Sequence, residues 1–133
     1  MLILCSNGLS SNKIITTLQE KLQGLKKSVL VVTADNEYKE RNYHVKRCIE
    51  ELKSLNLCVD IFDIDYQDVN LLSKYDVIEF IGGNPFYLLN SIKERKTEEV
   101  IKQLAKEKVL IGWSAAVFVF SPSLNLINIY SPE

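Results

Sequence analysis

The residues best suited to chemistry in this chain surround Ser114. A β-branched, apolar run over residues 108–111 stops at Gly112-Trp113-Ser114, and small residues follow. This pattern is typical of a nucleophile elbow, a sharp strand-to-helix turn that holds a serine hydroxyl above the sheet, where a substrate carbonyl can reach it. The motif Gly-x-Ser-x-Gly is matched except at its last position, which is Ala116. The sequence therefore predicts Ser114 as a nucleophile.

A second turn motif lies one strand–helix unit upstream. A strand-like run ends in Gly82-Gly83, and Asn84 and Pro85 then suit the N-cap and first position of a helix. Alone, the two glycines indicate only a tight turn. Because the carboxyl ends of parallel strands share one edge of a sheet, N–H groups of this turn and of Ala115 could converge on one oxyanion.

These placements predict which residues form the site around Ser114. Gly83 and Ala115 are expected to form an oxyanion hole for Ser114. Gly82, Asn84 and Trp113 are expected beside the substrate. For Trp113, packing against the sheet is an equally good interpretation.

The segments Gly82–Leu89 and Ile111–Ala116 resemble the peptidase E family of serine peptidases. The resemblance implies a glutamine-amidotransferase-like α/β fold, no cofactor, and hydrolysis of short peptides with a preference for N-terminal aspartate. Three positions depart from the family motifs: Ile81 and Ala116 replace glycines, and Pro85 replaces a threonine.

The family also activates its serine with a histidine and an acidic residue downstream of the elbow. Here the sequence ends at Glu133, and its single histidine is His44. We therefore expect a truncated peptidase fold with an incomplete triad. A second copy of the chain or a separate polypeptide could supply the missing half. The alternative is a non-catalytic remnant or binding module that keeps the fold and the elbow.

His44 is the one candidate for a replacement base within the sequence. It falls in an amphipathic pattern that follows the second expected strand. A base must lie within hydrogen-bond reach of the serine, and no pattern brings His44 there. We therefore expect a polar or half-buried helix residue.

Composition bears on the partners and the cellular compartment of the protein. The net charge of the 133 residues is −1, which gives no electrostatic case for nucleic acid or an anionic membrane. No apolar run reaches the ~20 residues that span a bilayer, and the first residues lack the basic region of a signal peptide. Cys5, Cys48 and Cys58 are widely spaced and predict reduced thiols, and thus a cytoplasmic protein.

No metal site is expected. The aspartates at positions 60, 63, 65 and 68 follow a strand end, where magnesium ligands sometimes gather. A hard cation needs convergent oxygens, whereas alternating side chains along a strand point apart. A solvated acidic loop is the favoured interpretation.

Alternating strand and helix patterns must position these residues. Strands are expected over 2–5, 28–33, 57–62, 75–81 and 108–112. Helices are expected over 10–23, 36–55, 85–95 and 97–107, with a short one after Ser114. Asp35 or Asn36 suits the N-cap of the second helix. The alternation predicts one α/β domain over residues 1–133, with a doubly wound, mostly parallel five-stranded sheet, helices on both faces and a flavodoxin-like core.

Overall fold

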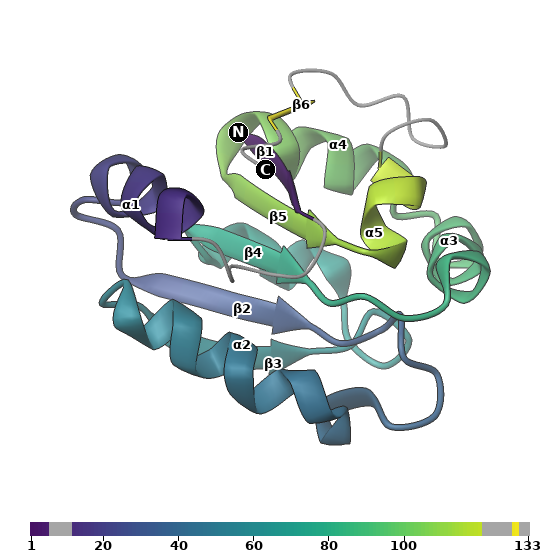
Figure 1. Cartoon of the computed structure of the whole chain (residues 1–133). Helices are drawn as coiled ribbons and strands as arrows, with labels where there is room; N and C mark the ends of the chain where they lie inside the picture. The colour runs from purple at the N-terminus through teal and green to yellow at the C-terminus, as the bar shows by residue number, and fades with distance from the viewer. Residues whose placement is uncertain (6–11, 121–128, 131–133) are drawn as a thin grey trace.

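A computed structural model describes residues 1–5, 12–120 and 129–130 of the chain. Strands and helices alternate along it, as expected (Figure 1). The strands are β1 (Leu2–Cys5), β2 (Lys27–Val31), β3 (Cys58–Phe62), β4 (Val77–Phe80), β5 (Val109–Trp113) and β6 (Ile129–Tyr130). The α-helices are α1 (Asn12–Lys21), α2 (Tyr43–Ser54), α3 (Pro85–Glu94), α4 (Glu98–Glu107) and α5 (Ala115–Phe118). The described residues also form the 3₁₀ helices η1 (Lys39–Arg41) and η2 (Val69–Lys74).

The sheet has the strand order β3-β2-β4-β5-β1-β6, and each neighbouring pair of strands is parallel. The predicted doubly wound α/β architecture is thus confirmed, with one addition. β6 extends the expected five strands to six by pairing with β1. A strand of two residues is too short to carry a periodic pattern, so sequence patterns could not predict it.

Two separate cores cover the faces of this sheet. Side chains of a strand alternate between faces, so Ile78 and Phe80 pack toward α3 and α4, whereas Val77 and Ile81 pack toward α1 and α2. The strands predicted at the buried centre are there: Ile78, Phe80, Leu110 and Ile111 are each at most 1% exposed.

The start of α2 differs from its prediction. The expected helix over 36–55 begins only at Tyr43, and its N-cap is Asn42, whose side chain accepts the His44 N–H at 2.8 Å. The Asp35 carboxylate instead accepts the N–H groups of Glu37 and Tyr38 and closes a turn before η1. Aspartate and asparagine stabilise both turns and caps, so the residue types alone did not distinguish the two sites.

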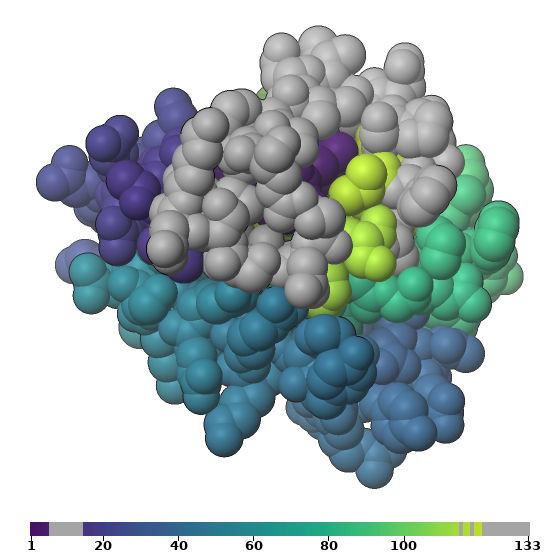
Figure 2. Space-filling view, in the orientation of Figure 1, coloured from purple at the N-terminus to yellow at the C-terminus, as the bar shows by residue number. Residues whose placement is uncertain are grey.

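α1 ends at Lys21, close to its expected end, and its expected start at residue 10 lies outside the described residues. In the parts of the chain that the structure describes, none of the helices has the length and apolar character needed to cross a membrane. Figure 2 shows that the yellow-green residues of the segment after β5 reach the surface beside α3.

Candidate active site

Ser114 occupies the single position between β5 and α5. β5 ends at Trp113 and α5 begins at Ala115, so the chain turns from strand to helix within one residue. Ser114 is exposed and has a φ of 55°, which L-residues rarely adopt. Its N–H donates to the Cys5 carbonyl at 3.3 Å, and its own carbonyl accepts the Val117 N–H at 3.0 Å. The predicted placement of the serine at a strained strand-to-helix turn is confirmed.

Gly112 explains how the turn tolerates Ala116. A Cβ on Gly112 would lie 2.9 Å from the Ala116 Cβ, closer than two carbon atoms can approach. The strand and the returning helix therefore do pass at close range, as an elbow requires. The missing side chain of Gly112 makes room for the extra methyl group, so the departure from the motif does not remove the turn.

The Gly82-Gly83 turn lies directly beside the serine. A Cβ on Gly82 would lie 2.6 Å from the Ser114 Cβ and 3.0 Å from the indole ring of Trp113. A Cβ on Gly83 would lie 2.5 Å from the Ala34 carbonyl oxygen. Both glycines are therefore required by close contacts, and the two turn motifs that the sequence predicted to meet do meet.

The backbone N–H groups of Gly83 and Ala115 are the candidates for binding an oxyanion. The Ala34 carbonyl accepts the N–H of Asn84 at 2.9 Å, and within the described part of the chain nothing accepts the N–H of Gly83. Ala115 is the first residue of α5, where backbone N–H groups have no acceptor within the helix. The oxyanion hole predicted from these two residues remains a prediction.

Asn84 and Trp113 are both held by the protein itself. The Asn84 side-chain oxygen caps α3, accepting the N–H groups of Phe86 and Tyr87 at 2.9 and 3.1 Å. Trp113 is only 4% exposed and belongs to the core on the α1 and α2 side of the sheet. The structure thus favours the interpretation in which Trp113 packs against the sheet, and a place for Trp113 beside the substrate remains a prediction.

Below the elbow lies a polar contact that sequence analysis missed. The Trp113 indole Nε1–H donates to Glu79 Oε2 at 3.1 Å, and Glu79 is fully buried in β4. Burial raises the pKa of Glu79 to about 7, despite the opposing hydrogen bonds from Cys48 and Trp113. Burial also raises the pKa of the Cys48 thiol, which keeps it protonated. The sequence signal that could have revealed this contact was Glu79 itself, an acidic residue within the apolar run over 77–81.

His44 lies nearer to the elbow than the sequence indicated. It is half-buried in the first turn of α2, and its ring meets the Trp113 ring edge-on, with 5.4 Å between ring centroids. His44 therefore contacts the residue that precedes Ser114, and the expectation of a half-buried helix residue is confirmed. The loop between β2 and α2 sets this position, and no local sequence pattern predicts its path.

The chemistry of His44 nevertheless does not suit a base. Its Nδ1 lies 3.4 Å from Arg47 Nη2. A guanidinium can only donate, so Nδ1 must accept and the ring proton sits on Nε2. Burial and the nearby Arg47 charge also lower the pKa of His44, which makes the ring a weaker base. Among the described residues no hydrogen bond joins His44 to Ser114.

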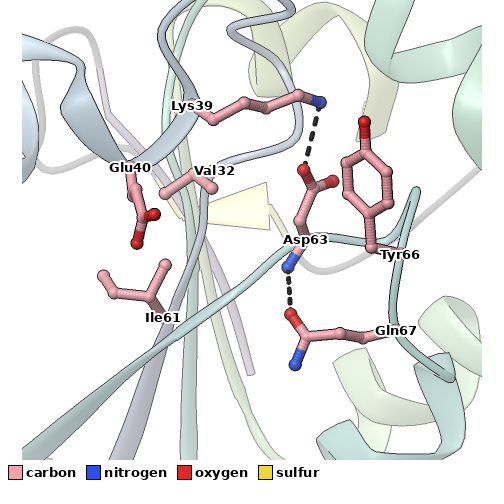
Figure 3. A pocket seen from close by; sticks show the side chains of 7 residues that line it. All are labelled: Val32, Lys39, Glu40, Ile61, Asp63, Tyr66 and Gln67. Carbon is pink, nitrogen blue, oxygen red and sulfur yellow. Dashed lines mark hydrogen bonds and ion pairs between the residues drawn. The ribbon is translucent and has the colours of Figure 1, made fainter.

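A cavity of about 310 Å³ lies at the carboxyl ends of β2 and β3, and Ser114 is not part of its wall (Figure 3). It is lined by Val32, Lys39, Glu40, Ile61, Asp63, Tyr66 and Gln67. Figure 3 shows the Lys39 side chain reaching toward Asp63, with 3.2 Å between Nζ and Oδ2. The same ammonium lies 2.8 Å from the Asp65 carboxylate.

This arrangement corrects the expectation of a solvated acidic loop. Asp60 and Asp68 are exposed as expected, but Asp63 is buried and Asp65 half-buried. Their charges are balanced by Lys39, a residue distant in sequence. Nowhere among the described residues do three or more histidine, cysteine or acidic side chains gather as a metal site would require.

Comparison with known proteins adds a family to this geometry. The model of peptidase family S51 matches residues 2–132. The chain is 30% identical over 120 residues to the uncharacterized peptidase Lmo0363 of Listeria monocytogenes serovar 1/2a, and 28% identical over 120 residues to the uncharacterized peptidase Lin0382 of Listeria innocua serovar 6a. Each match covers 86% of this chain. The chain spans 58% and 56% of the length of these two relatives.

Solved structures share the fold. A crystal structure of a protein proposed to be a peptidase E from Listeria monocytogenes EGD-e matches with a TM-score of 0.72 and 26% identity, covering 91% of this chain and 62% of that one. A peptidase from an acI-B1 actinobacterium matches with a TM-score of 0.69 and 20% identity, covering 90% of this chain and 56% of that one.

Proposed function

The chain belongs to peptidase family S51, and from this premise we propose that it carries the nucleophile side of a serine-type peptidase. Ser114 is the nucleophile in this proposal. The observation that carries it is the exposed Ser114 at a positive-φ turn, packed directly against Gly82. The substrates proposed are short peptides, with the N-terminal aspartate that the peptidase E resemblance implies. Cys5, Cys48 and Cys58 form no disulfide, and reduced cysteines favour the cytoplasm as the compartment.

The proposed reaction is acyl transfer to the serine. The Ser114 hydroxyl oxygen attacks the carbonyl carbon of the peptide bond while its proton passes to a base. The N–H groups of Gly83 and Ala115 hold the oxyanion that forms. The carbon–nitrogen bond then breaks, the amine leaves with a proton, and water hydrolyses the ester that remains on Ser114.

The base in this proposal comes from outside the described residues. A serine hydroxyl near its ordinary pKa is a weak nucleophile without a base beside it. Within the described part of the chain no hydrogen bond reaches the Ser114 hydroxyl, and the Nδ1 of His44 already accepts from Arg47. A second copy or a separate polypeptide is the proposed source of the base.

Covalent labelling tests the nucleophile. A serine-directed fluorophosphonate should modify Ser114 of the purified chain slowly, and peptide mapping should place the adduct there. S114A should abolish the adduct, whereas S73A, which changes an exposed serine in η2, should leave it unchanged. Equal labelling of the wild type and S114A would contradict the proposal.

The engagement of His44 by Arg47 favours a second candidate, a binding module without turnover. Hydrolysis of an aspartyl dipeptide separates the two functions. Without its base, a serine protease retains only ~10³–10⁴-fold acceleration over water. We expect the purified chain to show at most this residual rate, with S114A changing it little. Robust turnover that S114A abolishes would instead show a complete enzyme.

A further inference from the structure

Glu79 is an unusual residue for its place in the sheet. It lies in the middle of β4, paired with Leu30 of β2 and Ile111 of β5, and none of its surface is exposed. By strand alternation it shares a face with Val77 and Ile81, which belong to the core under α1 and α2. A carboxyl group therefore replaces an apolar side chain in a packed core.

Burial of this carboxyl group carries a cost that its contacts offset only in part. Its Oε2 accepts the Trp113 indole N–H at 3.1 Å, whereas Oε1 is buried and has no hydrogen-bond partner among the described residues. A buried charge carries a large desolvation penalty unless it is fully paired. An apolar residue at position 79 would avoid this penalty, so the stability of the core does not explain a glutamate.

One of the hydrogen bonds of Glu79, that with Trp113, leads directly to the elbow. Trp113 is the last residue of β5, and Ser114 follows it. The Trp113 ring and the Ser114 Cβ both approach Gly82 closely, at 3.0 and 2.6 Å from the position of a Cβ there. The indole thus packs between the elbow and the Gly82-Gly83 turn, and its hydrogen bond with Glu79 holds its orientation.

We propose that Glu79 is a positioning residue for Ser114, acting through the Trp113 indole. The carboxylate sets the orientation of the ring, and the ring sets the distance between the serine and the glycine turn. This inference rests on the proposed function only for the reactivity of Ser114. The link between Glu79 and Trp113 is a property of the fold and can be measured separately.

Several ionisable groups face or influence this carboxyl group, all from α2. The Arg47 charge lowers the pKa of Glu79 and Glu51 raises it, while the Cys48 thiol hydrogen bonds to it. β5 contributes only the indole, and the paired residue of β2 is Leu30. Because burial brings the pKa of Glu79 to about 7, its ionisation can be followed at mild pH.

Trp113 is the single tryptophan of the chain, so tryptophan fluorescence reports on the surroundings of this one indole, which include Glu79 and His44. In the wild type, the emission should change between pH 5.5 and 8.5 as Glu79 ionises, and E79Q should abolish the change. E51Q should keep the transition but move its midpoint to lower pH, because Glu51 raises the pKa of Glu79. H44Q should keep the transition too, which separates Glu79 from the imidazole beside the indole.

Labelling of Ser114 by a fluorophosphonate gives the second readout. E79Q retains an oxygen acceptor for the indole, so its Ser114 should be labelled at a rate within about threefold of the wild-type rate. In the wild type the labelling rate should change with pH over the range of the Trp113 transition, and in E79Q this change should be absent. E79A lacks the acceptor and should label at least tenfold more slowly, at a temperature where circular dichroism shows it folded. If E79A fails to fold, the loss of the pH transition in E79Q decides the matter.

The outcomes separate this inference from the proposed function. A flat Trp113 emission in the wild type, or the same transition in E79Q, would overturn the role of Glu79. Wild-type labelling rates retained in folded E79A would overturn it as well. A clear Trp113 transition with no labelling of Ser114 in any variant would count against the proposed peptidase function, and would reduce Glu79 to a structural contact.

Discussion

Gly83 is required at its position by two constraints at once. Its φ is 156°, and a Cβ there would lie 2.5 Å from the Ala34 carbonyl oxygen. Gly83→Ala should therefore cost more than the roughly 1–3 kcal/mol typical of backbone strain alone. Gly24→Ala is the matched control, since Gly24 also has positive φ but nothing lies within 4 Å of its Cβ position. Urea denaturation of both variants measures the difference, and equal losses of stability would refute the close contact.

At the same scale, His44 should be dispensable for the reactivity of Ser114. Its Nδ1 accepts from Arg47, and burial with the Arg47 charge lowers the pKa of the ring. H44Q should therefore leave the rate of phosphonate labelling within about twofold of the wild type, since base catalysis contributes ~10²–10⁴-fold where it operates. The labelling rate at pH 7.5 tests this. A hundredfold loss would identify His44 as the base after all.

Among the elements, α2 has the start that was hardest to predict. Asn42 caps it by accepting the His44 N–H at 2.8 Å and also donates to Asp35 at 2.6 Å. Asn42→Ala should lower the free energy of unfolding by about 1 kcal/mol. Asn36→Ala, at the exposed position where the sequence suggested a cap, should change it by less than about 0.5 kcal/mol. Thermal or urea unfolding measures both losses. A larger loss for Asn36→Ala than for Asn42→Ala would instead support a helix that begins near residue 36.

At the scale of helices and strands, the sequence predicted the features that depend on residues close together in the chain. The cap at Asn84 and the turn at Ser114 follow from residue types within a few positions of each other. The contacts of His44 with Trp113 and of Lys39 with Asp65 join segments far apart in the chain. Both depend on the path between β2 and α2, where Lys39 has a φ of 51°. No periodicity encodes such a path, and Glu79 was missed because its partner Trp113 lies on a different strand.

Two hydrophobic cores, one on each face of the sheet, stabilise the whole molecule. Substitution of Leu110 tests how tightly one of them is packed. Its side chain is fully buried on the face covered by α3 and α4. Leu110→Ala should cost roughly 2–5 kcal/mol, because the surrounding strands cannot collapse into the space. Leu71→Ala makes the same change at a residue of η2 that is 46% exposed, and should cost well under half as much. Similar values from chemical denaturation would mean that Leu110 is not part of a packed core.

At the edge of the sheet where the strands have their carboxyl ends, an ion pair and a hydrogen bond to Asp65 join three segments of the chain. Asp65 accepts hydrogen bonds from Lys39 at 2.8 Å and from the Tyr87 hydroxyl at 2.5 Å, which links η1, the loop after β3, and α3. Burial alone would raise the pKa of Asp65, but these hydrogen bonds hold it below the ordinary value. Burial would likewise lower the pKa of Lys39, yet the two aspartates raise it.

These opposite shifts predict the pH range over which the link stabilises the fold. A carboxyl whose pKa is lowered by folding contributes stability above its unfolded value of ~3.9 and loses it as the pH falls through the folded value. A lysine whose pKa is raised contributes below ~10.4 and loses it as the pH rises through the folded value. Asp65→Asn should therefore destabilise the protein most between about pH 5 and 9, by on the order of 1–2 kcal/mol for a half-buried pair.

Urea unfolding of the wild type and D65N from pH 3 to 10 measures this difference. It should shrink toward zero in acid, where the wild type also loses the charge of Asp65. Y87F removes one of the two hydrogen bonds and keeps the ion pair, so it should give a smaller loss of stability over the same range. A difference between the wild type and D65N that stays constant down to pH 3 would show that neither the ion pair nor its charge holds this edge together.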